Sequence, residues 1–205
     1  MANIMEQTIN ENSRTSLLYQ TVSRFIDLGF SICVIVFLWW ALAAAWLAVR
    51  LGSPGPVIFA QTRVGRFGKS FTCYKFRTMV VATKQAATHE IGQDSITNVG
   101  RFLRRTKIDE LPQIINILRN EMSLIGPRPC LESQTALIEA RRVRGVLSLK
   151  PGISGLAQVQ GVDMSDPEKL ATLDAEYLAR QSILLDLKII LATARGKALQ
   201  DRTKA

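Results

Sequence analysis

An uncharged run of 22 residues, positions 28–49, constrains this chain more than any other feature. As a helix with a rise of 1.5 Å per residue, the run would be about 33 Å long, and the hydrocarbon core of a bilayer is about 30 Å thick. The run is too long, and begins too far from the N-terminus, to be the apolar core of a cleaved signal peptide. The sequence therefore predicts a helix that lies in a membrane, in preference to a buried helix of a soluble protein.

Composition excludes several other classes of protein. The 205 residues are 47% apolar and carry 26 Lys and Arg against 17 Asp and Glu, a net charge of +9. This apolar content does not fit a disordered basic tail, and the charge together with the uncharged run does not fit a simple soluble enzyme. Three cysteines without CxxC spacing and one histidine, His89, argue against a disulfide framework, a zinc site and a histidine-based catalytic triad.

Proline and glycine divide the chain after the uncharged run. Residues 1–21 are polar and acid-poor, and we expect a flexible leader there. Residues 22–52 form the predicted membrane-anchoring helix, because Ser53-Pro54-Gly55-Pro56 must end any helix. Residues 53–205 remain for a second domain.

This second domain begins with strand signals. Short strands are predicted at 57–60 and 71–79, with a turn at 63–68 between them, and a loop follows at 80–97. Together with the helical signals further along, they predict an α+β fold, in which a small α/β lobe follows an N-terminal membrane helix.

The basic residues are concentrated after the uncharged run. No acidic residue occurs between Asp27 and Glu90, whereas seven basic residues do. The simplest explanation is the excess of positive charge on the cytoplasmic side of membrane proteins, and for Arg141, Arg142 and Arg144 we expect a solvated or lipid-facing position. An anionic ligand is the better explanation for basic residues in apolar or glycine-rich surroundings, namely Lys75, Arg77 and Arg128.

Two adjacent carboxylates lie within this basic region. Apolar residues recur at helical spacing up to about residue 119, and the predicted buried stripe consists of Leu111, Ile114, Ile115 and Leu118. Pro112 is tolerated only in a first turn, so the helix must begin near Asp109. Asp109 and Glu110 then lie at a helix N-terminus, where backbone N–H groups favour negative charge and also bind phosphate.

Two roles for these carboxylates stay open at this point. Thr106 and Asp109 have the spacing of a capping box, so the acids could simply cap the helix. Alternatively, flanking cations such as Arg104 and Arg105 could hold a phosphoryl group for attack by an aspartate, while a neighbouring carboxylate shares a cation such as Mg²⁺.

Five blocks in unbroken order resemble the small monotopic phosphoglycosyl transferases, a bacterial family. The blocks are YKFRTM at 74–79, GRFLRRTKIDELPQIINIL at 100–118, MSLIGPRP at 122–129, KPGISGLAQVQG at 150–161 and LLDLKII at 184–190. The resemblance extends over about residues 22–195.

The resemblance implies transfer of a sugar 1-phosphate from a UDP-sugar to polyprenyl (undecaprenyl) phosphate, through a covalent phosphosugar-aspartate intermediate and with release of UMP. This is the first membrane step of bacterial polysaccharide or glycoconjugate assembly. It implies an enzyme of the bacterial inner membrane whose catalytic domain, residues 53–205, lies on the cytoplasmic face. The implied partners are the two substrates and membrane phospholipids, and a homodimer is compatible with them.

The resemblance also assigns residues. Asp109 matches the nucleophile, and Glu110 matches its partner in a dyad associated with Mg²⁺. Candidate phosphate- and substrate-binding residues are Lys75, Arg77, Arg104, Arg105, Pro127, Arg128, Pro129, Gly152 and Gly155. For the two glycines we expect close backbone approach.

The membrane helix of this family is re-entrant: it enters and leaves on one face, is broken by a Ser-Pro pair, and is anchored by a Lys-Arg-x-x-Asp motif. Arg24 and Asp27 match the motif, whereas Trp39 and Trp40 stand where Ser-Pro is expected. A plain spanning helix and a re-entrant helix both stay open. The tryptophans favour the re-entrant form, because indole rings are accommodated best near the interface.

The C-terminal segment 182–199 is apolar but also charged. It fits either a helix that lies in the membrane interface or an ordinary packed helix. A membrane-tethered nucleic-acid-binding protein and a membrane scaffold are the rival functions. We expect no nucleic-acid partner, because glycine and proline turns interrupt the basic residues and no nucleic-acid motif appears. A scaffold would need neither the Asp109-Glu110 pair nor the Pro-Arg-Pro motif.

Overall fold

A computed structural model describes residues 2–80 and 95–196 of the chain. Most of the predicted loop at 80–97 lies outside these residues, and so does the end of the segment 182–199. The elements, in order, are α1 (Ala2–Gly52), β1 (Ile58–Val64), η1 (Arg66–Gly68), β2 (Ser70–Phe76), α2 (Asn98–Thr106), η4 (Ile108–Gln113), α3 (Ile114–Leu118), β3 (Ser123–Ile125), α4 (Thr135–Val143), η5 (Val146–Ser148), β4 (Gly152–Ser154), α5 (Leu156–Val159), α6 (Pro167–Ala179) and α7 (Ile183–Ala194). This mixture of helices and strands confirms the predicted α+β class.

Helix α1 is the longest element, with 51 residues. The predicted flexible leader is helical here and continuous with the apolar part, because no glycine or proline interrupts residues 2–28. Only α1, among the described residues, is long and apolar enough to cross a membrane, over Leu17–Gly52. Much of its apolar surface is exposed, including Phe37, Trp39, Trp40 and Leu51.

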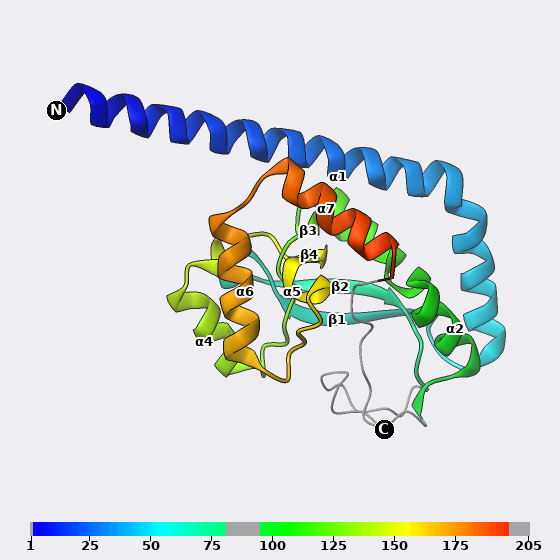
Figure 1. Ribbon diagram of the computed structural model, residues 1–205. Coiled ribbons are helices and arrows are strands. Elements are labelled where there is room, and N and C mark those ends of the chain that lie inside the picture. The colour runs from blue at the N-terminus through cyan, green and yellow to red at the C-terminus, as the bar shows by residue number, and fades with distance from the viewer. Residues whose placement is uncertain (1, 81–94, 197–205) are drawn as a thin grey trace.

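A sharp bend divides α1 into a long limb that lies along the top of the lobe and a shorter limb that descends beside it (Figure 1). Within the apolar stretch, the indole Nε1 of Trp40 donates a hydrogen bond of 2.9 Å to the carbonyl of Phe37. A side chain that inserts into the backbone hydrogen-bond ladder is one of the recognised causes of a bend without proline. The Trp40 bond is a candidate for this role, because Trp39 and Trp40 stand where the family pattern has Ser-Pro.

Strands β1 and β2 form the predicted antiparallel hairpin. Ile58 pairs with Phe76 and Val64 with Ser70, and the turn between them contains η1. The strands β3 and β4 form a second, parallel pair, with Ser123 opposite Gly152 and Ile125 opposite Ser154.

The helix after Asp109 begins as predicted but is rotated from the predicted phase. Its first part is the 3₁₀ helix η4, which contains Pro112, and the α-helical part is only α3. Ile115 and Leu118 of the predicted stripe are exposed, whereas Asn116 and Ile117 are fully buried. A 3₁₀ turn has three residues instead of 3.6, so the side chains that follow it point in different directions from those of a regular α-helix.

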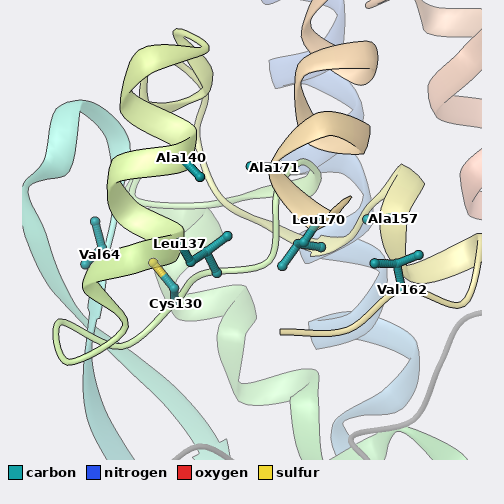
Figure 2. Packing of buried hydrophobic residues seen from close by; sticks show 8 residues of the cluster. All are labelled: Val64, Cys130, Leu137, Ala140, Ala157, Val162, Leu170 and Ala171. Carbon is teal, nitrogen blue, oxygen red and sulfur yellow. The ribbon is translucent and has the colours of Figure 1, made fainter. Parts of the chain in front are cut away.

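Three groups of buried apolar residues form the core. One lies between α4, α5 and α6 and is shown in Figure 2, where the side chains of Leu137 and Leu170 meet between α4 and α6. A second lies around α3, β3 and α7 and contains Ile117 and Ile189. The third joins the end of α1 to β2 and α2 through Val49, Phe76 and Leu103, so the long apolar helix shares its core with the lobe that follows it.

Helix α7 combines the two alternatives considered for the C-terminal segment. Ile189 and Asp186 are buried, whereas Leu184, Leu187 and Leu191 form an exposed stripe at helical spacing. The Asp186 carboxylate accepts hydrogen bonds of 2.8 Å from the hydroxyls of Tyr19 in α1 and Tyr177 in α6. One face of α7 is therefore packed and anchored, and an apolar face is left outward beside α1.

The expected solvated position of Arg141 is wrong. Arg141 is buried and forms an ion pair with Asp174 of α6, with an N–O distance of 2.7 Å. Burial raises the pKa of Asp174 above its usual range, although the guanidinium acts in the opposite direction. The partner is 33 residues away in sequence, so local context gave no sign of it. Arg142 and Arg144, in contrast, form ion pairs with the exposed carboxylates of Glu139 and Glu168.

Arg141→Met should lower the free energy of unfolding by about 3–5 kcal/mol, because Asp174 would keep a buried charge without its partner. Burial raises the pKa of Asp174, so the unpaired carboxylate is destabilising at a pH above that pKa, and the loss should shrink as the pH is lowered and the carboxylate is protonated. Thermal and denaturant unfolding in neutral detergent measures both effects. Arg142→Met, which removes an exposed pair, should cost no more than about 1 kcal/mol. Equal losses in the two variants would contradict this role of Arg141.

Candidate functional site

Asp109 and Glu110 lie in the first turn of η4, directly after α2. Lys107 between the two helices has a left-handed backbone, with φ of 58°, and this turns the chain sharply before the carboxylates. Thr106 does not complete a capping box, because its hydroxyl donates to the carbonyls of Phe102 and Leu103 in α2. The side chain of Lys107, which is the N-cap of η4, forms no capping bond either. The capping box that the Thr106-Asp109 spacing suggested is therefore not formed by Thr106.

Glu110 is the centre of a charged cluster. Its Oε1 accepts a hydrogen bond of 2.8 Å from Lys75 Nζ and one of 2.9 Å from Arg128 Nη2. The side chains of all three residues are less than a fifth exposed. Asp109, the neighbouring residue, is buried. The fold thus brings together two cations and two carboxylates from β2, η4 and the loop after β3, as the sequence analysis predicted for Lys75, Asp109, Glu110 and Arg128.

A buried asparagine fixes the strand that carries Lys75. Asn116 in α3 accepts a hydrogen bond from the backbone N–H of Tyr74, and its Nδ2 donates to the carbonyl of Thr72 and to Glu121. Strand β2 is therefore bonded to β1 on one edge and to a side chain on the other. The sequence analysis did not identify Asn116, although a polar residue inside the apolar block IINIL was a usable signal.

The loop Pro127-Arg128-Pro129 is held by all three of its carbonyl groups. The backbone N–H of Gly152 donates to Pro127, Arg141 donates to Arg128, and Arg63 donates to Pro129, at 2.9–3.0 Å. Two prolines also restrict φ on either side of Arg128. The backbone of Arg128 is consequently fixed while its side chain reaches Glu110. Arg63 and Arg141 are positioning residues of this loop that sequence reasoning missed.

The predicted close approach at Gly152 and Gly155 is confirmed, and the neighbour is protein backbone. A Cβ on Gly152 would lie 2.1 Å from the nitrogen of Gly126, and one on Gly155 would lie 2.3 Å from the oxygen of Gly126. Both glycines therefore allow β4 and the turn after it to pack against the residue that precedes Pro127. Their direct contact with a substrate stays a prediction.

Arg104 and Arg105 lie at the end of α2, one turn before the carboxylates. Arg104 is half-buried, and its Nε donates to the hydroxyl of Thr78 at 2.9 Å. Arg105 is exposed, and its guanidinium lies 6.0 Å from the ring of Phe102. The side of α2 that precedes the cluster therefore carries further positive charge, and phosphate binding by these two arginines stays a prediction.

The surroundings of Arg77 differ from those of a ligand-binding residue. Arg77 is buried, and its guanidinium donates to the carbonyls of Ser53 and Pro56 and to the Ser53 hydroxyl, in the loop that follows α1. A third carbonyl, that of Val49 in the last turn of α1, lies 3.5 Å away. Carbonyls at a helix C-terminus lack partners within the helix, and Arg77 provides one. The described contacts of Arg77 thus secure the C-terminal end of α1.

Arg24 and Asp27 connect α1 to the lobe. Arg24 donates to the carbonyls of Ile117 and Leu118 in α3, at 2.6 and 3.2 Å. Asp27 is buried, and its Oδ1 accepts from the Ser123 hydroxyl and the Leu124 backbone N–H, at 3.0 and 2.8 Å. Arg24 thus contacts α3, which follows the turn with Asp109 and Glu110. Asp27 contacts β3, which precedes the loop with Arg128.

The two buried cysteines near the cluster are poor candidates for a nucleophile. Burial raises the pKa of the Cys73 thiol above its usual value, and it also raises the pKa of Cys130. A thiol with a raised pKa stays protonated at neutral pH, and the protonated form is a poor nucleophile. Within residues 2–80 and 95–196, no three His, Cys, Asp or Glu side chains gather into a protein-only metal site. Asp109 and Glu110 could hold a hard cation together with a ligand's own oxygens, which is the usual arrangement for Mg²⁺.

Comparison with known proteins agrees with this arrangement. Residues 18–199 match the model of the bacterial sugar transferase family. The chain is 39% identical over 183 residues to the UDP-glucose:undecaprenyl-phosphate glucose-1-phosphate transferase of Escherichia coli, covering 84% of this chain and 39% of that protein.

Two further relatives differ in length and in name. The chain is 38% identical over 178 residues to the uncharacterized sugar transferase EpsL of Bacillus subtilis, covering 85% of this chain and 86% of that protein. It is 38% identical over 203 residues to a UDP-N-acetylgalactosamine-undecaprenyl-phosphate N-acetylgalactosaminephosphotransferase of Aeromonas hydrophila, covering 91% and 47%. The chain therefore spans less than half the length of two of these relatives and most of the third.

Arg77→Met should lower the free energy of unfolding by about 2–3 kcal/mol in the absence of any ligand, because the loop carbonyls would lose charged donors. Thermal unfolding of the detergent-solubilised protein measures the change. Arg101→Met is the matched control, since Arg101 is an exposed arginine on α2 and its removal should change the stability by less than about 0.5 kcal/mol. Unchanged stability in Arg77→Met would contradict the contacts described and favour a binding role.

Proposed function

The chain belongs to the bacterial sugar transferase family, and from this premise we propose that it transfers a sugar 1-phosphate from a UDP-sugar to polyprenyl phosphate, with release of UMP. The observation that carries the proposal is the charged cluster. Lys75 and Arg128 converge on Glu110, which adjoins the buried Asp109. Two cations fixed beside two carboxylates suit a substrate that carries a diphosphate and is attacked by an acid.

Asp109 is the proposed nucleophile. A carboxylate oxygen of Asp109 forms a bond to the β-phosphorus of the UDP-sugar while the bond from that phosphorus to the bridging oxygen breaks, so that UMP leaves with the electron pair. A phosphate oxygen of polyprenyl phosphate then attacks the same phosphorus, and the aspartate carboxylate is released unchanged. Both half-reactions exchange one phosphoryl bond for another, so the main tasks of the protein are positioning and charge compensation.

The surrounding residues divide these tasks. Lys75 and Arg128 bind phosphate oxygens of the donor, and the fixed Pro127-Arg128-Pro129 loop keeps the guanidinium aimed at them. Asp109 and Glu110 would hold a Mg²⁺ ion together with the diphosphate, since this ion commonly binds through one or two carboxylates and substrate phosphates. The ion would neutralise charge on the diphosphate. Arg104 and Arg105 add positive charge from α2 for either anionic substrate.

The proposed location is the inner membrane, with the lobe on its cytoplasmic face. We propose that α1 enters and leaves on that face, which its bend supports (Figure 1). The exposed apolar stripe of α7 would lie against the same surface. This arrangement places the lobe where a lipid-linked phosphate and a soluble nucleotide sugar can both reach Asp109. A homodimer stays a prediction.

Asp109→Asn should lower UMP release by at least about a hundredfold, because an amide cannot form the covalent intermediate. Purified protein is incubated with a panel of UDP-sugars and polyprenyl phosphate, and UMP is quantified. Incubation with the labelled donor alone should label the wild-type chain and leave Asp109→Asn unlabelled.

The matched control is Glu139→Gln, which removes an exposed carboxylate on α4 and should keep wild-type turnover. Undiminished UMP release in Asp109→Asn would refute the covalent mechanism. A wild-type chain that releases UMP from none of the UDP-sugars would refute the proposed donor class.

A re-entrant α1 should protect single cysteines placed within residues 2–20 from a membrane-impermeant thiol reagent applied to intact cells, in a Cys33→Ser background. The same cysteines should react after the inner membrane is opened. Trp40→Phe, which removes the donor to the Phe37 carbonyl, should increase labelling in intact cells, whereas Trp39→Phe should not. Full labelling, in intact cells, of the single-cysteine chains that keep Trp40 would show that α1 spans the membrane.

A further inference from the structure

A second basic site lies between α1 and the lobe, apart from the charged cluster. A cavity of about 100 Å³ is lined there by three cations, Arg24 of α1, Arg66 of η1 and Lys150 before β4. Lys75, Glu110 and Arg128 are not part of its wall. The volume exceeds that of several water molecules. The mechanism proposed above gives this cavity no task.

The cavity has an excess of positive charge. Its wall contains one carboxylate, Asp27, and the Oδ1 of that carboxylate already accepts two hydrogen bonds from β3. Burial, together with the nearby charges of Arg24 and Arg66, lowers the pKa of Lys150 below its usual value. Three cations around one engaged carboxylate leave an environment that an anion would stabilise.

Two of the three cations have donors to spare, whereas both terminal nitrogens of Arg24 already donate to carbonyls of α3. Among the hydrogen bonds of the described residues, Arg66 uses its Nε for the carbonyl of Ser148, and Lys150 uses one bond for Asn120. The two terminal nitrogens of Arg66 and two N–H groups of Lys150 therefore remain for a ligand. A guanidinium and an ammonium group together match the several acceptor oxygens of a phosphate.

The position of the cavity indicates where such a phosphate would come from. Asp27, in its wall, immediately precedes Leu28, the first residue of the uncharged run. A cavity at the start of a membrane-embedded segment lies at the depth of the lipid headgroups. Exposed apolar side chains flank two wall residues: Leu18 precedes Tyr19, and Phe67 follows Arg66. Polar walls with apolar neighbours suit a ligand that has a charged head and an acyl tail.

We propose that this cavity binds the phosphate of an anionic membrane phospholipid, with Arg66 and Lys150 as its ligands and Arg24 as a further positive charge in the wall. The bound lipid joins α1, the β1–β2 hairpin tip and the segment before β4 from one side of the membrane. The proposal rests on the membrane position proposed for α1 and is independent of the transfer chemistry at Asp109.

The test measures binding to the full chain, purified in neutral detergent and freed of lipid. Native mass spectrometry and thermal stabilisation are recorded with dihexanoyl phosphatidylglycerol, with dihexanoyl phosphatidylcholine and with inorganic phosphate. We expect one phosphatidylglycerol to bind at least about tenfold more tightly than phosphatidylcholine. We expect inorganic phosphate to bind more weakly than phosphatidylglycerol. Equal affinity for the two lipids would overturn the proposal, as would full stabilisation by inorganic phosphate at the same concentration.

Variants locate the binding. Arg66→Gln and Lys150→Gln should each weaken phosphatidylglycerol binding by at least about fivefold. Gln181→Glu, which adds a negative charge to the wall with little change of shape, should do the same and guards against a loss that reflects misfolding. Lys69→Gln is the matched control, because it removes an exposed charge three residues from Arg66 and should leave the affinity unchanged. An equal loss in Lys69→Gln would indicate diffuse attraction and overturn the site.

Asp109→Asn separates this proposal from the proposed function. That variant should lose UMP release and keep wild-type affinity for phosphatidylglycerol. Farnesyl phosphate serves as a further ligand in the binding assay. If it displaces phosphatidylglycerol and binds more tightly, the cavity belongs to the isoprenoid acceptor and the phospholipid assignment is wrong.

Discussion

The bonds of Arg24 and Asp27 to the lobe are the constraint on which the rest of the structure depends. Arg24 binds α3, which continues from the turn that holds Asp109, and Asp27 binds β3, which leads to Arg128. One turn of α1 is thus bonded to both chain segments that supply the charged cluster. A buried carboxylate at the start of an apolar run is costly unless it is bonded, so this contact also selects one position of α1 on the lobe.

The net charge of +9 separates into groups with different physical tasks. Arg77 and Arg141 are buried and bind backbone carbonyls, so they act as internal supports of the fold. Lys75 and Arg128 converge on Glu110. A third group surrounds the cavity beside α1. Guanidinium groups predominate among the supports because one planar group can satisfy several carbonyls at once.

Local signals in the sequence predicted the elements that depend on near neighbours. The hairpin followed from its turn residues, and the start of η4 followed from Pro112. The choice of buried side chains in the following helix α3 could not be predicted in the same way, because a 3₁₀ turn has no distinct pattern of apolar residues. Helix α6 was missed despite the Asp166-Pro167 start signal. For the site, Lys75 and Arg128, which the sequence analysis named as candidates, both contact Glu110. The contacts of Arg77 and Arg141 depend on partners distant in sequence.

The three bonded carbonyls of the Pro127-Arg128-Pro129 loop have a consequence for specificity in the proposed reaction. A loop whose backbone is bonded at every residue, and whose φ angles are restricted by two prolines, keeps one shape whichever ligand approaches it. Selection among hexoses would then depend on segments outside this loop.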